Sequence, residues 1–379
     1  MSDIYQQSLQ LHEKLQGKME TKSKFTLKSR TDLALAYTPG VAEPCRVIAS
    51  NPEQAKNLTL KGNTVAVISD GSAVLGLGNI GPLAAIPVME GKAILFKEFA
   101  NINAFPICLN TQNEEEIINI IKNIAPVFGA INLEDISAPR CFNIEKRLKE
   151  ELDIPVMHDD QHGTATVVLA ALINALKVRD SEKENLKIVI SGAGSAGSAI
   201  TDLLRQYGFI NIIVCDREGA IYSDRANLSE SKKWLASISN PHQEKGKLTE
   251  IINGADIFIG VSAPGLLSQE MIKTMNNKPI IMALANPTPE IMPDDAKKAG
   301  AFIVATGRSD FPNQVNNVLA FPGIFKGTLD NKVKQITDRM LIQAAKNLAN
   351  LVKNPTEEEI LPDPFNPGVV SAVANAIKD

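Results

Sequence analysis

The sequence predicts an α/β protein with an N-terminal α/β domain and a C-terminal domain built on a doubly wound parallel sheet of the Rossmann type. Three observations support this class. The chain has 379 residues, more than one ordinary hydrophobic core holds. Short apolar runs alternate with longer segments of helical periodicity. A glycine-rich turn at 192–197 stands between an apolar run and a helical segment. We place the domain boundary at Gly163, which gives domains 1–163 and 164–379.

The first domain begins with a polar helical segment, followed by a Pro- and Gly-rich loop at 36–52. Strands and helices then alternate, with a glycine-rich turn at 72–88. Segment 113–128 has apolar positions at helical spacing and acids in its first turn, as expected of an amphipathic helix. The expected strands are 63–71, 91–99, 104–110, 129–136 and 154–160, and the expected helices are 113–128 and 141–152.

The second domain begins with a helix after Gly163 that leads to a charged connector at 177–186. Segment 187–208 predicts a strand, a glycine turn and a helix. The tail from about Asp330 is amphipathic, and we expect its helices to pack back across the domains. Because ligand sites favour clefts between domains, we expect one near Gly163. The further expected strands are 211–219, 255–262, 278–287 and 301–307.

The composition excludes several classes of protein. A net charge of -4 without a basic block argues against a nucleic-acid partner. Each apolar run is broken well before a membrane-spanning length, and the polar start lacks the pattern of a signal peptide. The absence of a CxxC pair favours reduced thiols in the cytoplasm over a disulfide framework or a zinc site. The four cysteines are Cys45, Cys108, Cys141 and Cys215.

The stretch HDDQH places Asp159 and Asp160 side by side between His158 and His162, directly before an apolar helical segment. Adjacent carboxylates repel each other, and burying them is costly unless something positive meets them. A helix N-terminus supplies partial positive charge, and a bound metal ion supplies more. The sequence of this stretch alone leaves both explanations open.

A second acidic pair, Glu134 and Asp135, ends an expected strand. Together with Asp160 it forms a candidate all-oxygen site, which suits Mg²⁺ or Mn²⁺. Zinc would draw mainly on His or Cys ligands, so the alternative role of His158 and His162 is structural, as partners of the acids or caps of the helix.

The turn GAGSAG provides Gly192, Gly194 and Gly197 in the GxGxxG pattern, with Ser195 and Ala196 between the last two glycines. The first glycine permits a tight turn, the second lets the backbone approach a pyrophosphate, and the third lets the helix pack on the strand. The preceding strand and following helix are the context that a dinucleotide-binding site requires.

The next strand ends at Asp216, roughly 20 positions after the glycines, where such sites place a ribose-binding carboxylate. Asp216 favours NAD because it would repel a 2′-phosphate. Arg217 beside it could instead bind that phosphate, so NADP stays open.

Tyr37, Lys92, Asn286 and Asn317 are further candidate site residues, but none of them indicates a function by itself. Tyr37 lies on the Pro/Gly loop, and Lys92 precedes the expected strand that contains Lys97. A lysine partly buried near a cation would have a depressed pKa and could act as a base. Asn286 and Asn317 follow apolar runs beside prolines, where they either form turns or donate to a carboxylate substrate.

The motifs YTPGVAEP, DGSAVLGLGNIGPLAAIPVMEGK, LEDI, HDDQHGTA, GAGSAG, ANPTPE and NNVLAFPG occur in the order seen in malic enzymes. The chain resembles the short bacterial form of that family over essentially its full length. The resemblance implies oxidative decarboxylation of L-malate to pyruvate and CO₂ with NAD(P)⁺ and Mg²⁺ or Mn²⁺, in a homodimer. It also implies that the N-terminal domain holds the substrate and the metal.

The resemblance also implies roles for individual residues, including one departure. Larger members carry an arginine that holds a malate carboxylate where this chain has Ala73, so Ser72 and neighbouring backbone amides are candidate replacements. The implied roles are metal ligation by Glu134, Asp135 and Asp160, base catalysis by Lys92, acid catalysis by Tyr37, support of Lys92 or the metal by Asp159, and carboxylate binding by Asn286 and Asn317, Asn286 also lying by the nucleotide.

Three alternatives differ in what they require. An oxaloacetate decarboxylase would use the metal, Lys92 and Tyr37 without net hydride transfer. A non-catalytic NAD sensor would not need the three carboxylates, and neither would an amino-acid dehydrogenase. In a homodimer, the N-terminal helix and the Tyr37 loop could pack against the partner's cleft.

Overall fold

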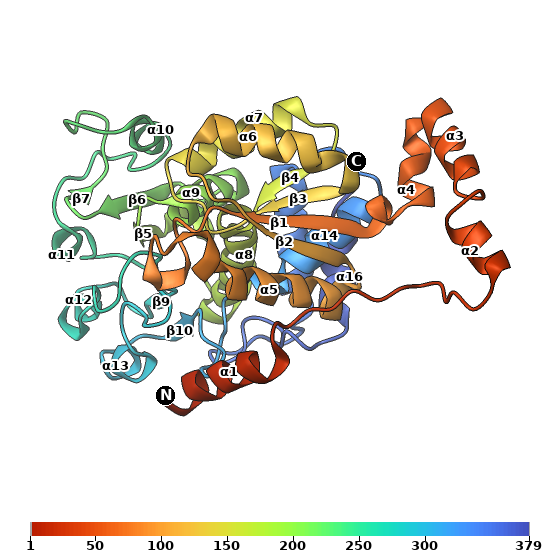
Figure 1. Ribbon diagram of the computed structural model, residues 1–379. Helices are drawn as coiled ribbons and strands as arrows, with labels where there is room; N and C mark the ends of the chain where they lie inside the picture. The colour runs from red at the N-terminus through yellow and green to blue at the C-terminus, as the bar shows by residue number, and fades with distance from the viewer. Residues whose placement is uncertain (1, 379) are drawn as a thin grey trace.

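The computed structural model describes residues 2–378 and contains two sheets (Figure 1). The first has four parallel strands in the order β2-β1-β3-β4, and the second has six in the order β10-β9-β8-β5-β6-β7. Only the β6–β7 pair is antiparallel among the pairs of the described chain. The predicted α/β class with a Rossmann-like second sheet is confirmed.

The first sheet brings chemical groups to one edge. Its strands are parallel and in register, so the residues that follow them meet at the carboxyl-terminal edge. Asp70 follows β1 there, Glu134 follows β3 and Asp159 follows β4. The strands are β1 (Thr64–Ser69), β2 (Asn103–Cys108), β3 (Ala130–Leu133) and β4 (Val156–His158).

The two faces of this sheet are covered by different helices. Ala66 and Ile68 point to a core shared with α6 (Glu114–Ile124) and α7 (Arg140–Glu151). Val65 and Val67 point to the other core. This alternation follows the period of two of a β-strand. The second core is shared with α5 (Gly81–Ala100), α8 (Asp159–Arg179) and α14 (Phe321–Asp330).

The strand expected at 91–99 was wrong, because this segment is the second half of helix α5. Buried residues recur at helical spacing from Ala85 through Met89 and Ala93 to Phe96. The apolar run 91–99 lacked this context when taken alone, and short apolar runs do not distinguish a strand from a buried helix. The glycine-rich turn expected at 72–88 correspondingly ends before Gly81.

The second sheet has β5 in its interior, with β6 on one side and β8 on the other, so the strand order reverses beside β5. Open α/β sheets bind ligands at such a reversal. Helix α9 (Ser195–Tyr207) follows β5, as the glycine motif predicted. The strands are β5 (Lys187–Ser191), β6 (Asn211–Asp216), β7 (Gly219–Ala220), β8 (Ile257–Gly260), β9 (Ile280–Ala283) and β10 (Ile303–Thr306).

Helix α8 connects the two sheets. It begins at Asp159, not after Gly163, and runs without a break through the expected domain boundary. It contacts α9 and α15 (Asp338–Ala349), and one continuous hydrophobic core includes residues from both sheets. The C-terminal helices complete this core: α16 (Gly368–Ala374) packs on α14, and α14 packs on α5.

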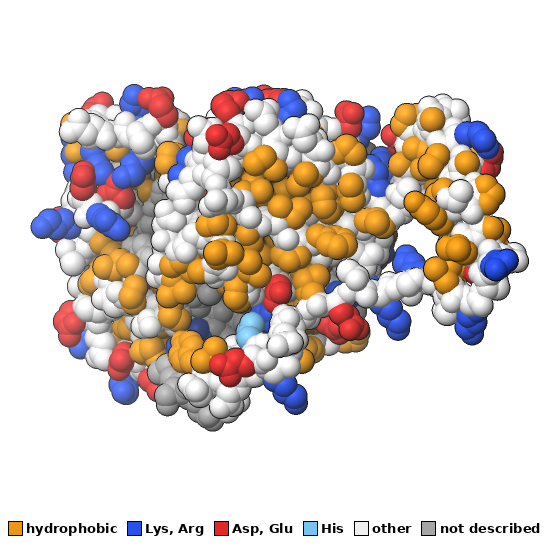
Figure 2. Space-filling view, in the orientation of Figure 1, with side chains coloured by type: hydrophobic (Ala, Val, Ile, Leu, Met, Phe, Trp, Pro, Cys, Tyr) orange, Lys and Arg blue, Asp and Glu red, His pale blue; other side chains and the backbone are white. Residues whose placement is uncertain are grey.

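An arm, residues 21–58, projects from the side of the molecule (Figure 1). Its helices are α2 (Arg30–Ala36), α3 (Ala42–Ser50) and α4 (Ala55–Leu58), and none of them contains a buried residue. Apolar side chains cover part of its surface in Figure 2. Helix α1 (Ser2–Leu15) precedes it, and Lys18 fixes the intervening chain by donating to Glu90 and to the Pro87 carbonyl of α5. No helix in the described residues combines the length and apolar character needed to cross a membrane.

Candidate active site

Three carboxylates meet at the carboxyl-terminal edge of the first sheet. Glu134, Asp135 and Asp160 can each place one oxygen within 4.8 Å of the others. Glu134 and Asp135 are buried, and the backbone N–H of Asp135 donates to Asp160 Oδ2 at 2.8 Å. The geometry unites the acids of LEDI and HDDQH, as their sequence positions predicted.

Burial makes two of these carboxylates, Glu134 and Asp160, hard to ionise. It raises the pKa of Asp160 to about 6 and also raises the pKa of Glu134, where Lys92 opposes it. Like charges held together in a water-poor site favour protonation unless a cation neutralises them. Hard oxygen donors gathered in this way suit Mg²⁺ or Mn²⁺, and these three residues could hold such an ion.

Lys92 extends from α5 into the acidic cluster. Its Nζ lies 2.6 Å from Asp159 Oδ2 and 2.9 Å from Glu134 Oε1, and its side chain is 8% exposed. Nζ also lies 4.2 Å from the centre of the Phe321 ring on α14. The lysine thus links three segments that are distant in the sequence.

The protonation of Lys92 differs from the expectation. Burial alone lowers the pKa of Lys92, but the carboxylates of Asp159 and Glu134 outweigh it and raise the pKa above its usual value. The predicted depression of the pKa required a nearby cation, whereas bare carboxylates act in the opposite direction.

Asp159 occupies the first turn of α8, where the helix N-terminus favours negative charge. Burial nevertheless raises the pKa of Asp159 to about 7, against the attraction of Lys92. Gly163 explains how this side chain fits, because a Cβ at Gly163 would lie 1.8 Å from Asp159 Oδ1. The same Cβ would lie 3.4 Å from Cβ of Asn317, which places Asn317 against this turn.

Glu145, which lies outside the motif HDDQH, contacts both histidines of that motif. Glu145 of α7 accepts the backbone N–H of His158 at 3.0 Å, and its carboxylate lies 3.0 Å from Nε2 of His162. Burial acts to raise the pKa of Glu145, but His162 and Lys149 outweigh it and lower the pKa. Neither histidine belongs to the carboxylate cluster of the described residues, which fits a structural role.

Ser72 has its hydroxyl occupied within the protein. It donates to Asp70 and accepts from the backbone N–H of Ser137 and from Nη2 of Arg140. Arg140 also forms an ion pair with Asp70 at 2.7 Å. The structure therefore places Ser72 in an internal polar cluster beside the sheet edge, and sequence reasoning overlooked Asp70 and Arg140.

The glycine motif lines a cavity of about 860 Å³ at the reversal of the second sheet. Gly192 has φ +126°, and a Cβ there would lie 2.7 Å from the Val261 carbonyl. A Cβ on Gly197 would lie 1.8 Å from the Gly192 carbonyl, whereas Gly194 faces open space. These positions match the roles expected of the three glycines. Ser195 and Ala196 form the first turn of α9 beside the cavity.

Asp216 and Arg217 also line this cavity. The Asp216 carboxylate pairs with Arg225 and with Lys232, each at 2.6 Å. Burial acts to raise the pKa of Asp216, but hydrogen bonds from these two cations outweigh it and lower the pKa. Arg225 and Lys232 were missing from the sequence prediction.

Asn286 follows β9 and reaches the first domain. A Cβ on Gly76 would lie 2.1 Å from the Asn286 carbonyl, so this glycine allows the two loops to touch. The side-chain amide of Asn286 lies against Gly307, after β10. The residue thus stands where the glycine-rich loop of the first domain meets the second sheet.

Tyr37 lies apart from both the carboxylate cluster and the glycine-motif cavity. It caps α2 in the arm and is 68% exposed. The arm joins the body just before the amino end of β1 (Figure 1). The carboxylate cluster lies at the opposite, carboxyl end of the strands. One chain does not bring Tyr37 to Lys92.

The comparison with known proteins agrees with this arrangement. Residues 16–149 match the family described as malic enzyme, N-terminal domain, and residues 161–374 match malic enzyme, NAD binding domain. An NAD-dependent malic enzyme of Geobacillus stearothermophilus is 57% identical over 95% of this chain and 76% of its own length. A bifunctional malic/malolactic enzyme of Bacillus subtilis is 52% identical over 99% of this chain and 92% of its own length.

The fold comparison gives the same result. The crystal structure of the NAD-dependent malic enzyme from Thermotoga maritima superposes with a TM-score of 0.95 at 51% identity, covering 98% of both chains. The carboxylate cluster, the cavity at the glycine motif and the similarity over nearly the full chain therefore all point to the same family. The chain belongs to the malic enzyme family, whose reaction is the oxidative decarboxylation of malate with NAD(P).

Proposed function

We propose that Lys92 and Asp159 carry out the proton transfers of L-malate oxidation beside a divalent cation held by Glu134, Asp135 and Asp160. The observation that carries this proposal is the position of Lys92 Nζ, within 2.9 Å of both Glu134 and Asp159 in a buried site. A base must lie within hydrogen-bond reach of the proton it removes, and a substrate bound at the cluster would place its hydroxyl there.

Mg²⁺ or Mn²⁺ would supply Lewis-acid polarisation of the substrate oxygens when bound. Its charge would also offset the carboxylates that now hold the proton on Lys92, which favours the neutral amine. Lys92 then accepts the C2 hydroxyl proton while hydride leaves C2 for the nicotinamide. Asp159, 2.6 Å from Nζ, is the next acceptor for that proton.

Asn286 and Asn317 are our candidates for binding the malate carboxylates. Asn317 lies against the first turn of α8, and Asn286 stands between the glycine-rich loop and the second sheet. Neutral amides bind a carboxylate without adding charge next to the base. Ser72 is already hydrogen-bonded to Asp70 and Arg140. We therefore propose that Ser72 holds Arg140 and the Ala73 loop in place and does not contact the substrate.

We propose NAD as the preferred dinucleotide, with NADP as the alternative. Support comes from Asp216, which keeps its negative charge through Arg225 and Lys232 and faces the cavity. A carboxylate there accepts hydrogen bonds from the ribose hydroxyls and repels a 2′-phosphate. Arg217 is the residue that would serve NADP.

We further propose a homodimer in which the arm delivers Tyr37 to the partner's active site. The arm exposes large apolar side chains, with Leu33 51%, Leu35 66% and Tyr37 68% exposed. Apolar surface of this kind on a projecting segment marks an interaction site. After CO₂ leaves, the Tyr37 hydroxyl would donate the proton that completes C3 of pyruvate.

Metal titration tests the assignment of the carboxylates. Mn²⁺ binding followed by electron paramagnetic resonance should weaken by about tenfold or more in Glu134→Gln and Asp160→Asn, which each lose a ligand oxygen. Asp159→Asn should bind Mn²⁺ nearly as the unmodified protein does. An equal loss of Mn²⁺ affinity in all three variants would contradict the assignment of Glu134 and Asp160 as metal ligands and of Asp159 as the partner of Lys92.

A further inference from the structure

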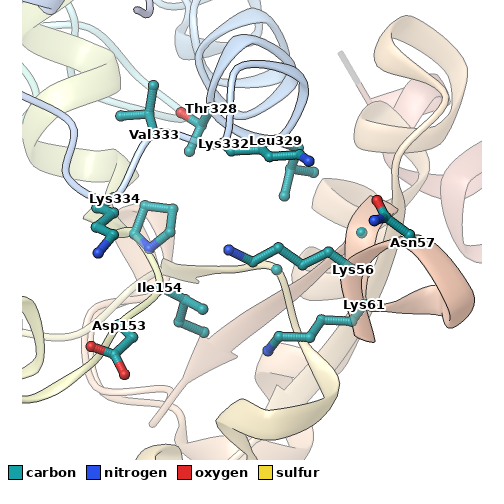
Figure 3. Close-up of a pocket in the computed structure, with 13 residues that line it drawn as sticks. Lys56, Asn57, Lys61, Asp153, Ile154, Thr328, Leu329, Lys332, Val333 and Lys334 are labelled. Atoms are coloured by element: carbon teal, nitrogen blue, oxygen red, sulfur yellow. The ribbon is translucent and has the colours of Figure 1, made fainter. Parts of the chain in front are cut away.

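A second cavity lies at the base of the arm (Figure 3). It encloses about 200 Å³ between three parts of the chain. They are α4 with the segment that follows it, the turn before β4, and the end of α14 with the residues after it. Four of its lining side chains are lysines and one is an aspartate. The lysines are Lys56, Lys61, Lys332 and Lys334, and the aspartate is Asp153.

Figure 3 shows these lysines on two sides of the cavity: Lys56, reaching toward its middle, and Lys61 on the side of the arm, and Lys332 and Lys334 on the C-terminal segment. Lys332 and Lys334 form no ion pair or hydrogen bond with the described residues through their ammonium groups. Lys56 pairs only with Glu53 at 3.1 Å, a carboxylate that is 76% exposed. Exposed pairs of this kind are weak, so Lys56 can exchange its partner.

Lys61 forms the floor of the cavity and is already fixed. Its Nζ donates to the carbonyls of Ala125, Pro126 and Phe128, at 3.2, 3.1 and 2.6 Å. Burial lowers the pKa of Lys61, and repulsion from Lys56 lowers it further. Two carboxylates oppose the four lysines: Asp153 lines the cavity, and Glu53 attracts Lys56, Lys332 and Lys334 from outside the lining. Four positive charges against two negative ones leave the region with a net positive charge.

The end of α14 offers a simpler reason for two of the lysines. Cations stabilise the negative end of a helix dipole, and Lys332 and Lys334 directly follow α14. That reason does not apply to Lys56 and Lys61, which come from the base of the arm and line the same cavity. Convergence of cations from two separate segments instead suits an anion between them.

We propose that this cavity binds a compact phosphate-class anion, which joins the base of the arm to the end of α14. Lysines bind phosphate as point charges, whereas planar carboxylates are usually bound by arginine, which is absent from the lining residues. No aromatic side chain lines the cavity to stack a nucleotide base, and its volume is below the range typical of larger ligands. Inorganic phosphate, pyrophosphate and short phosphate monoesters share the required chemistry.

The close packing around the cavity supports a link between the base of the arm and the end of α14. A Cβ on Gly129 would lie 2.5 Å from the Lys61 carbonyl and 2.7 Å from Leu329 of α14, so only glycine lets these segments approach. Helix α14 begins at Phe321, under Lys92, and ends at the cavity. The site is independent of the proposed function, because it uses none of the groups assigned to malate, metal or dinucleotide.

The test is thermal unfolding and calorimetric titration of the full chain with inorganic phosphate, pyrophosphate or glycerol phosphate. Saturating NAD⁺ fills the dinucleotide cavity, no metal is added, and chloride holds the ionic strength constant. The anion should raise the unfolding temperature of the unmodified protein in a saturable manner. A stronger effect of glycerol phosphate would identify an esterified ligand, and a stronger effect of the inorganic anions would identify a free one.

The double substitution Lys332→Gln with Lys334→Gln should weaken binding about tenfold, because two charge contacts are lost. Both residues are exposed, so the variant should fold, and its own unfolding temperature without anion is the baseline for the effect of the anion. Lys298→Gln with Lys353→Gln makes the same charge change at exposed lysines outside the cavity and should bind normally. Absence of binding to the unmodified protein, or equal affinity in both double variants, would overturn the proposal.

Discussion

Lys92 Nζ lies 2.6 Å from Asp159 Oδ2, although the two residues are 67 positions apart and belong to different helices. Both side chains are buried. In such surroundings a proton shared between an amine and a carboxylate is governed by nearby charge. This pair makes the carboxylate cluster a candidate for proton transfer as well as for metal binding.

The Asp159→Asn substitution should lower kcat by about a hundredfold or more, the usual contribution of general acid–base groups. The amide keeps the shape of the side chain but cannot take a proton from Lys92. Steady-state rates with L-malate check this. Asp180→Asn, at the opposite end of α8, is the matched control and should leave the rate unchanged. Retained turnover in Asp159→Asn would remove Asp159 from the mechanism.

The Gly163→Ala substitution should lower turnover by about a hundredfold, because its Cβ would lie 1.8 Å from Asp159 Oδ1 and displace the carboxylate. Alanine is otherwise favoured over glycine within a helix by about 0.5–1 kcal/mol. Gly91→Ala on α5 provides the comparison, since its Cβ would have a contact of 3.5 Å with Lys18 Nζ. Gly163→Ala should therefore have a lower rate and a lower unfolding temperature than Gly91→Ala. Equal rates in the two variants would contradict this role of Gly163.

The metal-free protein should lose stability as the pH rises from about 4 to about 7. The folded-state pKa values of Asp160 and Asp159 are raised to about 6 and about 7 from 3.8, and the pKa of Glu134 is also raised. Burial lowers the pKa of His158 and acts in the opposite direction, but one imidazole opposes three carboxyls, so the folded protein binds more protons in this window. Unfolding temperatures of chelator-treated protein at pH 5 and pH 8 measure the effect. Added Mn²⁺ should stabilise more strongly at pH 8, since the ligands bind it deprotonated. A chelated protein that is more stable at pH 8 would contradict the raised pKa values of these carboxyls.

The Asp216→Ser substitution should shift the ratio of kcat/KM for NAD⁺ over NADP⁺ by about tenfold or more toward NADP⁺. It removes the charge that repels a 2′-phosphate and frees Arg225 and Lys232. Initial rates with each dinucleotide provide the measurement. Asp224→Asn, an exposed acid nearby in the sequence, should leave the ratio unchanged. An unaltered ratio in Asp216→Ser would assign the preference to other residues.

Mixed dimers test whether Tyr37 acts on the partner's site. Tyr37→Phe and Lys92→Ala chains should each be nearly inactive alone. If they are unfolded and refolded together, hybrid dimers would contain one intact site, restoring about a quarter of full activity under random pairing. Activity that stays at the level of the separate variants would confine each site to a single chain.

Short-range patterns predicted the fold class, the glycine turn and the acids that follow the strands. Glu134 and Asp160 could be paired in advance because parallel strands bring their carboxyl ends to one edge. The apolar run beside Lys92 predicted a strand, and only the buried positions from Ala85 onward reveal the helix.

Partners contributed from other segments had no sequence signal. Glu145 sits on a neighbouring helix and Arg225 beyond the strand it supports, so nothing near HDDQH or Asp216 indicates them. The place of Tyr37 could not be predicted either, because a loop motif does not say whether it serves its own chain or another. Long-range packing decides these contacts.

The most direct test measures NAD(P)H absorbance and pyruvate with the purified protein, L-malate, Mn²⁺ and either NAD⁺ or NADP⁺. Unmodified protein should form reduced nucleotide and pyruvate in equal amounts, chelator should abolish both, and Lys92→Ala should form neither at a comparable rate. Release of CO₂ from oxaloacetate without any reduced nucleotide from malate would contradict the account and indicate a decarboxylase that retains an unused dinucleotide cavity.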